Sequence, residues 1–386
     1  MRTLDAKKLG SILRQRTEED VENGKLAGAA MIVSQHGETV CELRFGVSDK
    51  RTGEPLKPHA MFRLASMTKP VTGVACLLGI QNGWFGLYDK VSDYLPKFAD
   101  MSVGRIENGR AVADHKPKSE ILIYQLLSHC SGFVPDDELG ALQRVRFPAQ
   151  AYSDNRTMVD YCIEHTLLSF DPGERTCYHG RMPFDVLACI IQDRSGMSFA
   201  DFVYKNIFEP IGIKDITFSP TEDQWDRMVT MYDKMSFPGS MAAVDMGRST
   251  FEGFPLSYTC AGTSLAGTLE DYSKFAELLR GRGEYKGVRV FKSELLDLMR
   301  KPYVPDGVPG RKEEDSWGLG VRVAVHNKVL PNGTFGWSGA YGTHFWVDLE
   351  NDITAVFMKN NRWYDSHGWG VTGANFEKDV MSALKD

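Results

Sequence analysis

The sequence predicts an α/β protein of the α+β type, with a central antiparallel sheet built from both chain ends, helices flanking it, and an inserted helical region. Three observations support this prediction: strand-like segments occur near both ends, a helical block separates them, and a helical segment stands at each terminus. We expect a sheet subdomain from residues 1–60 and 255–386, and a mainly helical subdomain from residues 61–254.

The N-terminal part supplies one helix and two strands of this prediction. Residues 5–24 alternate apolar and charged side chains at helical spacing, and Asn23-Gly24 ends the segment. Residues 28–35 and 39–46 then have the composition of two strands around a turn at His36-Gly37.

The middle of the sequence has mainly helical patterns, whereas the C-terminal part has mainly strand-like patterns. Helices are expected at 66–81, where Asn82-Gly83 ends the segment, and at 119–132, 155–168, 182–196 and 198–212. Gly-rich and Asn-Gly turns separate strand-like segments within 317–327, 333–349 and 352–361, and a closing helix is expected at 373–386.

Composition excludes several classes of function. The chain has 386 residues, 42% of them hydrophobic and 25% charged, with a net charge of -6, so nothing indicates a nucleic-acid partner. No apolar run approaches the length of a membrane span, and the N-terminus lacks the apolar core of a secretory signal. The seven cysteines form no C-x-x-C pair, so we expect free thiols, no metal site and a cytoplasmic protein.

Ser66 and Lys69 are the first candidates for chemistry. Residues three apart share one helix face, so the serine hydroxyl can lie beside the amine near the positive end of a helix. A buried lysine gives up its proton more readily than a solvated one, and it can then accept the proton of a serine nucleophile. The pair alone is also compatible with ordinary helix-start chemistry, because serine is a favoured N-cap.

The blocks around this pair resemble the serine β-lactamase and penicillin-binding-protein superfamily, most closely its class C-like branch of esterases, D-aminopeptidases and related acyl hydrolases. Similar blocks occur in family order at 61–96, "LLSHCSGF" (126–133), "FDPGERTCYHG" (170–180), "GTSLAGTLEDYSKFAELL" (262–279) and "GWSGAYGTHFWVD" (336–348). The resemblance covers nearly the whole chain. It implies a β-lactamase/transpeptidase-like fold and an acyl-enzyme at Ser66, with no cofactor.

The resemblance also assigns the remaining catalytic groups. Tyr178 occupies the tyrosine position of the family's Y-x-N motif, where a phenol beside an ammonium can relay protons. The backbone amides of Ser66 and Ala340 correspond to the oxyanion hole, and Gly339 would allow close backbone approach.

Two departures from the family pattern bear on the substrate. Gly180 replaces the asparagine of Y-x-N, and Trp337 replaces the Lys or His that opens the third motif. Both replacements disfavour β-lactams and D-Ala-D-Ala peptides, whereas an aromatic wall suits an uncharged ester. The expected pocket residues are Trp337, Ser338, Gly339, His344 and Gly180.

Histidines offer an alternative to the Ser–Lys interpretation. A Ser–His–acid triad could use His129, His179 or His344. We expect none, because lysine supplies the base and no acidic residue is placed to orient any of these rings. His129 is expected to be structural.

The sequence therefore predicts a serine acyl hydrolase that acts on small-molecule esters or amides, without nucleic-acid or membrane partners. A β-lactamase, a D-Ala-type peptidase or penicillin-binding protein and an acyltransferase are alternatives within the same chemistry. A non-catalytic binding member of the fold is the alternative from another class. The oligomeric state is not predicted.

Overall fold

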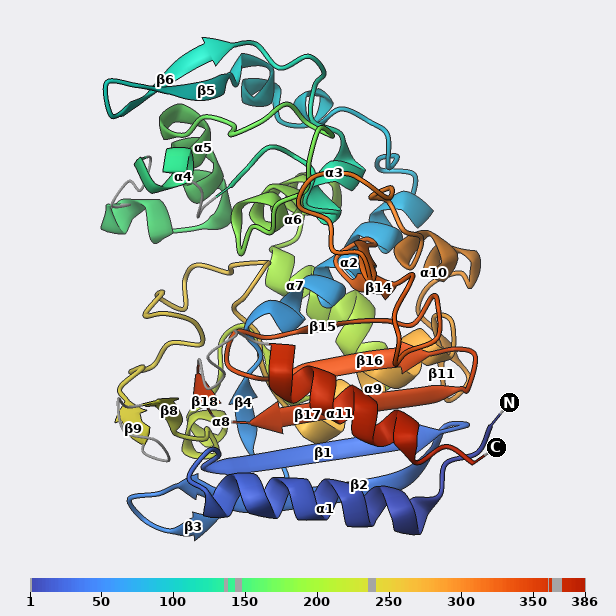
Figure 1. Cartoon of the computed structure of the whole chain (residues 1–386). Helices are drawn as coiled ribbons and strands as arrows, with labels where there is room; N and C mark the ends of the chain where they lie inside the picture. Colours follow the sequence, from blue (N-terminus) through green and yellow to red (C-terminus); the bar gives the residue numbers. More distant parts are fainter. Residues whose placement is uncertain are drawn as a thin grey trace.

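An eight-stranded antiparallel sheet forms the lower half of the computed structural model, which describes residues 2–134, 138–142, 148–234, 241–359, 361–362 and 370–385 (Figure 1). Its strands, in spatial order, are β13 (Asp315–Trp317), β14 (Arg322–Ala324), β15 (Phe335–Ser338), β16 (His344–Asp348), β17 (Ile353–Lys359), β1 (Gly28–Gln35), β2 (Glu38–Asp49) and β3 (Glu54–Pro55). The prediction of a central sheet made from both chain ends is confirmed, because β17 pairs directly with β1.

Both faces of this sheet are buried, and the alternation along β1 shows how. Ala29, Met31 and Val33 belong to the apolar core under the terminal helices, whereas Ala30 and Ile32 belong to the larger core on the opposite face. Successive side chains of a strand point to opposite faces, so a strand that is buried along its whole length needs cover on both sides.

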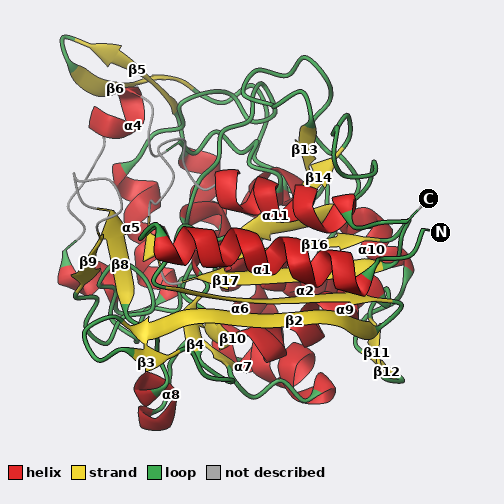
Figure 2. Ribbon diagram, turned by 60° about the horizontal axis from the view of Figure 1, so that its bottom comes forward, coloured by secondary structure: helices red, strands yellow, loops and turns green. Residues whose placement is uncertain are grey.

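Helices provide that cover. α1 (Ala6–Glu22) and α11 (Gly370–Ser382) lie side by side on one face, and α9 (Leu269–Arg280) packs against β1, β16 and β17 on the other (Figure 2). The Asp5 carboxylate accepts hydrogen bonds from two backbone N–H groups of the first turn of α1, which explains where this helix begins.

Most of the helical block occupies the upper half of Figure 1, and its last helix lies at the lower left. Its helices are α2 (Thr68–Gln81), α3 (Ile123–Leu127), α4 (Glu138–Leu142), α5 (Asn155–His165), α6 (Met182–Ser195), α7 (Phe199–Val203) and α8 (Glu222–Asp226), while α10 (Glu294–Met299) follows α9.

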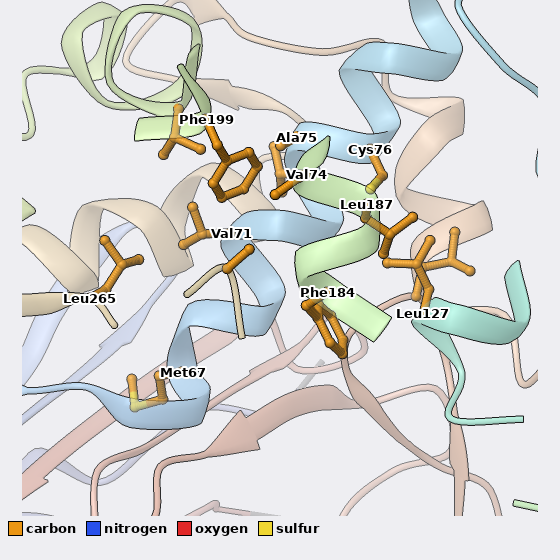
Figure 3. Packing of buried hydrophobic residues seen from close by; sticks show 14 of the residues in the cluster. Met67, Val71, Val74, Ala75, Cys76, Leu127, Phe184, Leu187, Phe199 and Leu265 are labelled. Carbon is orange, nitrogen blue, oxygen red and sulfur yellow. The ribbon is translucent and has the colours of Figure 1, made fainter. Parts of the chain in front are cut away.

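α2 runs through the centre of the large core. Val71 and Val74 of α2 pack with Phe184 and Leu187 of α6 and with Phe199 of α7 (Figure 3), and all five side chains are fully buried. A helix that is buried on every side provides a rigid support for the residues at its start.

Short strands complete the fold. They are β4 (Met61–Arg63), β10 (Ala266–Thr268) and β7 (Ile216–Thr217) in one sheet, β18 (Asn361–Arg362), β8 (Met231–Lys234) and β9 (Met241–Val244) in a second, and the hairpins β5 (Val103–Glu107)–β6 (Arg110–His115) and β11 (Glu284–Tyr285)–β12 (Val288–Arg289). Among the described residues, none of the helices combines the length and the apolar character that crossing a bilayer requires.

Two expectations for the helical block were wrong in detail. The helix expected at 119–132 is only α3, because Leu122 is extended and His129 has a positive φ of 57°. The helix expected at 198–212 breaks after Val203 into a π-helical turn and a short 3₁₀ turn that contains Pro210.

The β5–β6 hairpin within this block was also not predicted. Asn108 and Gly109 form its two-residue turn with φ values of 50° and 70°. Asn-Gly is the typical sequence of such a turn, so this signal was present in the sequence.

Candidate active site

Ser66 lies in a 3₁₀ turn, Ala65–Met67, between strand β4 and helix α2. The expectation that Ser66 occupies the first α-helical turn was therefore wrong by one short turn. Ala65 has a φ of 45°, a left-handed conformation that costs free energy for any residue except glycine. Burial of Ala65 among Met231, Phe251 and Tyr341 holds this turn in place.

Lys69 is fully buried, and its Nζ atom has three oxygen neighbours. These are Ser66 Oγ at 3.2 Å, the Gly180 carbonyl oxygen at 2.7 Å and the Gly262 carbonyl oxygen at 2.9 Å. In the part of the chain that the structure describes, no carboxylate forms an ion pair with Lys69. A neutral amine has two N–H donors and one lone pair, so the two carbonyls can take both donors and leave the lone pair facing Ser66.

Tyr178 closes the cluster from the other side. Its hydroxyl lies 2.5 Å from Ser66 Oγ, and the Lys69 Nζ atom lies 4.9 Å from the centre of its ring. Either hydroxyl can donate in the short hydrogen bond. Side chains from two distant parts of the sequence thus meet at the Ser66 hydroxyl, and this arrangement would allow proton transfer during a nucleophilic attack.

The carbonyls that hold Lys69 depend on close backbone approach. A Cβ atom on Gly262 would lie 2.4 Å from the Gly180 oxygen, so only glycine fits there. A Cβ atom on Gly180 would meet nothing within 4 Å, so the position of the missing asparagine side chain is open space. The backbone oxygen of residue 180 therefore contacts the lysine although the family's amide side chain is absent.

A buried carboxylate supports the loop that carries Gly262. Asp185 of α6 accepts hydrogen bonds from the Ala261 amide at 2.8 Å and from the Tyr258 hydroxyl. Burial raises the pKa of Asp185 to about 6, although these hydrogen bonds lower it in part. No motif in the sequence pointed to this carboxylate.

The Ala340 amide lies in the tight loop between β15 and β16. Ala340 packs against the same small apolar cluster as Ala65, so the loop lies beside the 3₁₀ turn that carries Ser66. A Cβ atom on Gly339 would lie 2.3 Å from the Leu64 carbonyl oxygen, which shows how closely the two backbones approach. Within the described residues, neither the Ser66 nor the Ala340 amide donates a hydrogen bond to another protein group.

The aromatic part of the site is larger than the sequence indicated. The Trp337 ring lies 5.4 Å from Tyr178 and 4.6 Å from Trp317, measured between ring centres. Trp317 also stacks on Tyr178 at 5.9 Å and meets the His129 ring at 4.4 Å. No motif pointed to Trp317, because it belongs to β13 and reaches the site only through the pairing of β13 with β14 and of β14 with β15.

Ser338 and His344 do not lie beside Trp337. They are directly paired across β15 and β16, and strand alternation turns both toward α11, on the opposite face of the sheet from Trp337. His344 bonds to Ser338 and to Glu377 of α11, at 2.8 Å and 3.0 Å. The structure therefore separates this pair from the other expected pocket residues.

The expectation that no acidic residue orients a histidine was wrong, since Glu377 does so. The sequence predicted the closing helix only as a cover for the sheet. No motif distinguished Glu377 from an ordinary acidic residue of such a helix. The other two histidines have no acidic partner among the described residues.

His129 and His179 occupy supporting positions. The His179 Nδ1 atom accepts hydrogen bonds from the amides of Arg181 and Met182 at the start of α6, and burial lowers the pKa of His179 to about 3. Burial also lowers the pKa of His129 well below its usual value. His129 packs between Tyr178, Trp317 and Phe184, so both rings are neutral parts of the scaffold near neutral pH.

This fold, in which the buried Ser66 and Lys69 and the half-buried Tyr178 meet at the start of a central helix, is that of the serine hydrolases of the β-lactamase class. The family model described as Beta-lactamase matches residues 13–365, and the chain belongs to that family. The chain is 26% identical over 394 residues to Esterase EstB of Burkholderia gladioli, covering 95% of this chain and 94% of that protein.

Two solved structures establish the same fold at 20% identity. EstCE1, described as a hydrolase with promiscuous acyltransferase activity, superposes with a TM-score of 0.78 and covers 98% of both chains. A mutant of simvastatin synthase from Aspergillus terreus superposes with a TM-score of 0.80 and covers 97% of both chains.

Proposed function

We propose that this protein is a carboxylic ester hydrolase that forms an acyl-enzyme at Ser66. One observation carries the proposal: the Ser66 hydroxyl lies within hydrogen-bond reach of both the Tyr178 hydroxyl and the fully buried Lys69 amine. The similarity to Esterase EstB over nearly the whole chain supports an ester as the substrate.

Acylation begins when Ser66 Oγ attacks the ester carbonyl carbon and gives its proton to the neutral Lys69 amine. The negative charge that develops on the carbonyl oxygen is stabilised by the amides of Ser66 and Ala340. When the C–O bond of the ester breaks, the leaving alkoxide takes a proton from the Tyr178 hydroxyl. Lys69 then restores that proton, so the alcohol leaves neutral and both side chains return to their starting states.

Deacylation repeats these steps with water. A water molecule attacks the acyl carbon while Lys69 accepts its proton, and the Ser66 oxygen then leaves and regains a proton. The product is a carboxylic acid. Among the described residues, the hydrogen-bond partners of the amine are the uncharged Ser66 hydroxyl and two backbone carbonyls, so the amine can gain and lose a proton in each half-reaction without breaking an ion pair.

The walls of the site favour small uncharged esters. Trp337 and Trp317 form an aromatic surface beside Tyr178, and aromatic rings bind apolar acyl or alcohol groups well. The open space next to Gly180 leaves room for such a group. Trp337 also brings no positive charge to a position where a lysine or histidine would attract a substrate carboxylate.

Intact-mass labelling combined with ester kinetics tests the proposal. We expect a fluorophosphonate probe to add once, at Ser66, and short-chain p-nitrophenyl esters to be hydrolysed with a burst of nitrophenol equal to the enzyme concentration. Ser66→Ala should abolish both, whereas Ser11→Ala, a change on the exposed face of α1, should alter neither. Labelling that persists in Ser66→Ala would contradict the assignment of the nucleophile.

The same acyl-enzyme could transfer its acyl group to an alcohol. Addition of 1-butanol during turnover separates the two outcomes, because transfer produces a butyl ester in place of the free acid. Nitrocefin in a parallel assay tests the β-lactamase alternative, for which we expect slow turnover at most.

A further inference from the structure

A chain of polar side chains runs from the end of β15 to the C-terminal helix. Ser338 Oγ lies 2.8 Å from His344 Nδ1, and His344 Nε2 lies 3.0 Å from Glu377 Oε1. Arg322 of β14 completes the chain through an ion pair with Glu377. His344 and Glu377 are each only 4% exposed, so this is an interior network and not a surface contact.

The hydrogen-bond directions in this chain follow from the charge of Glu377. Burial raises the pKa of Glu377, but the charge of Arg322 and the hydrogen bonds from His344 and Arg322 outweigh burial and hold the pKa at about 2. An ionised carboxylate only accepts hydrogen bonds, so the proton of a neutral His344 ring lies on Nε2. His344 Nδ1 is then left to accept the hydrogen bond of the Ser338 hydroxyl.

The polar network meets the backbone at the base of the loop that carries Ala340. Ser338 directly precedes Gly339 and Ala340, and His344 directly follows Thr343, so the pair closes the base of the β15–β16 loop. Thr343 anchors the same loop to the nucleophile turn, since its hydroxyl donates to the Leu64 carbonyl at 3.1 Å. The Ala340 amide therefore lies between one anchor on α11 and one anchor next to Ser66.

The contact with α11 is also tightly fitted. A Cβ atom on Gly373 would lie 3.3 Å from the His344 ring, so a glycine lets the helix approach the ring closely. A polar chain buried without its partners costs free energy, because each unmet donor or acceptor loses its hydration. The complete hydrogen-bonded network therefore holds the base of the β15–β16 loop in one geometry.

We propose that Ser338, His344 and Glu377 are positioning residues that fix the Ala340 amide for oxyanion binding, so that the C-terminal helix determines turnover. The proposal rests on the proposed function, because it assumes that Ala340 stabilises the oxyanion formed at Ser66. None of the three side chains needs to touch the substrate.

Glu377→Gln provides the first test, because Gln keeps the shape of the side chain but removes its charge. Asp379→Asn is a matched control, since Asp379 lies on the same helix, is 5% exposed and pairs with Arg16 of α1 instead of the loop. Both variants should lower the melting temperature.

Only Glu377→Gln should lower kcat, by about 10-fold to 100-fold with KM within twofold, which is less than the loss of a whole oxyanion donor. It should also weaken binding of an alkyl boronic acid, a mimic of the tetrahedral intermediate, by a similar factor. Equal kcat values for Glu377→Gln and Asp379→Asn would overturn the proposal.

Ser338 provides a second test that does not disturb the ion pair. Ser338→Ala should lower kcat and boronate affinity, and Ser338→Thr, which keeps the hydroxyl, should restore them. The double variant Ser338→Ala/Glu377→Gln should lose little more than either single variant, because both break the same chain. Fully additive losses would contradict a shared positioning role.

These outcomes remain separate from those that test the proposed function. If Ser66→Ala keeps its activity, the acyl-enzyme itself is wrong. If Ser66→Ala is inactive but the Glu377 and Asp379 variants behave alike, only the positioning role is wrong.

Discussion

Two serines in this protein, the buried Ser66 and the half-buried Ser338, each lie beside a basic side chain, and their surroundings differ in charge. Ser66 lies beside Lys69, whose other partners are the carbonyl oxygens of Gly180 and Gly262. Ser338 lies beside His344, which an ionised Glu377 holds from the far side. The two clusters lie on opposite faces of the large sheet.

The difference teaches what makes a buried base reactive. In the proposed mechanism the Lys69 amine gains and loses a proton during turnover, and no carboxylate among the described residues forms an ion pair that this would break. An imidazole held by a carboxylate that is itself paired with Arg322 has fixed hydrogen-bond directions, which suits positioning. The following predictions test this contrast in order of decreasing effect on the protein.

Replacement of Lys69 should give the largest effect. Lys69→Met keeps the length of the side chain but removes the base, so kcat/KM for a p-nitrophenyl ester should fall by roughly 10³-fold or more. Lys274→Met, which removes a lysine paired with Asp271 on α9, should keep its activity. Activity above a tenth of the wild-type value in Lys69→Met would show that the amine is not the base.

Removal of the Tyr178 hydroxyl should have the next largest effect. Tyr178→Phe keeps the ring against Trp317 and Trp337 but loses the 2.5 Å contact with Ser66, so kcat should fall by about 10²-fold. The loss should be smaller for nitrophenyl esters than for alkyl esters, because nitrophenolate leaves without a proton. Tyr94→Phe, which removes a hydroxyl bonded to Asp89, is the control.

A change in the two backbone carbonyls that hold Lys69, those of Gly180 and Gly262, should have a moderate effect. Gly262→Ala places a Cβ atom 2.4 Å from the Gly180 oxygen, so the two carbonyls must move apart around Lys69. We expect about a tenfold loss of kcat, equivalent to ~1.4 kcal/mol on the barrier. The control is Gly10→Ala in the interior of α1, where the added Cβ atom meets no close atom and kcat should stay unchanged. If kcat is also unchanged in Gly262→Ala, the positions of the two carbonyls do not influence the reactivity of Lys69.

The smallest effect concerns stability and comes from the second cluster. The pKa of Glu377 is held at about 2 against an ordinary value of 4.5, so the folded state gains stability above pH 4.5 and loses it as the pH falls toward 2. From pH 7 to pH 4 the loss should be under about 1 kcal/mol. Urea unfolding at several pH values measures it, and the stability gap between wild type and Glu377→Gln should narrow as the pH falls. A constant gap would contradict a low pKa for Glu377.

Local patterns predicted the parts of the site that are close in sequence. The three-residue spacing of Ser66 and Lys69 predicted that the hydroxyl lies beside the amine, and the apolar run that follows predicted the buried helix α2. Strand-like composition around the His36-Gly37 turn likewise predicted β1 and β2, and Asn23-Gly24 predicted the end of α1, because these features depend on a few neighbouring residues. Motif resemblance added Tyr178 and Ala340, which lie far away in the chain.

Only the tertiary structure decided the rest. Every residue has a backbone carbonyl oxygen, so no sequence pattern could show that the carbonyls of Gly180 and Gly262 hold Lys69. The approach of Glu377 to His344, and the place of Trp317 beside Tyr178, depend on how the last helix and the sheet edge pack. The sequence by itself determined which groups are available for chemistry, whereas long-range packing determined their distances and partners, because those depend on contacts between segments that are far apart in the sequence.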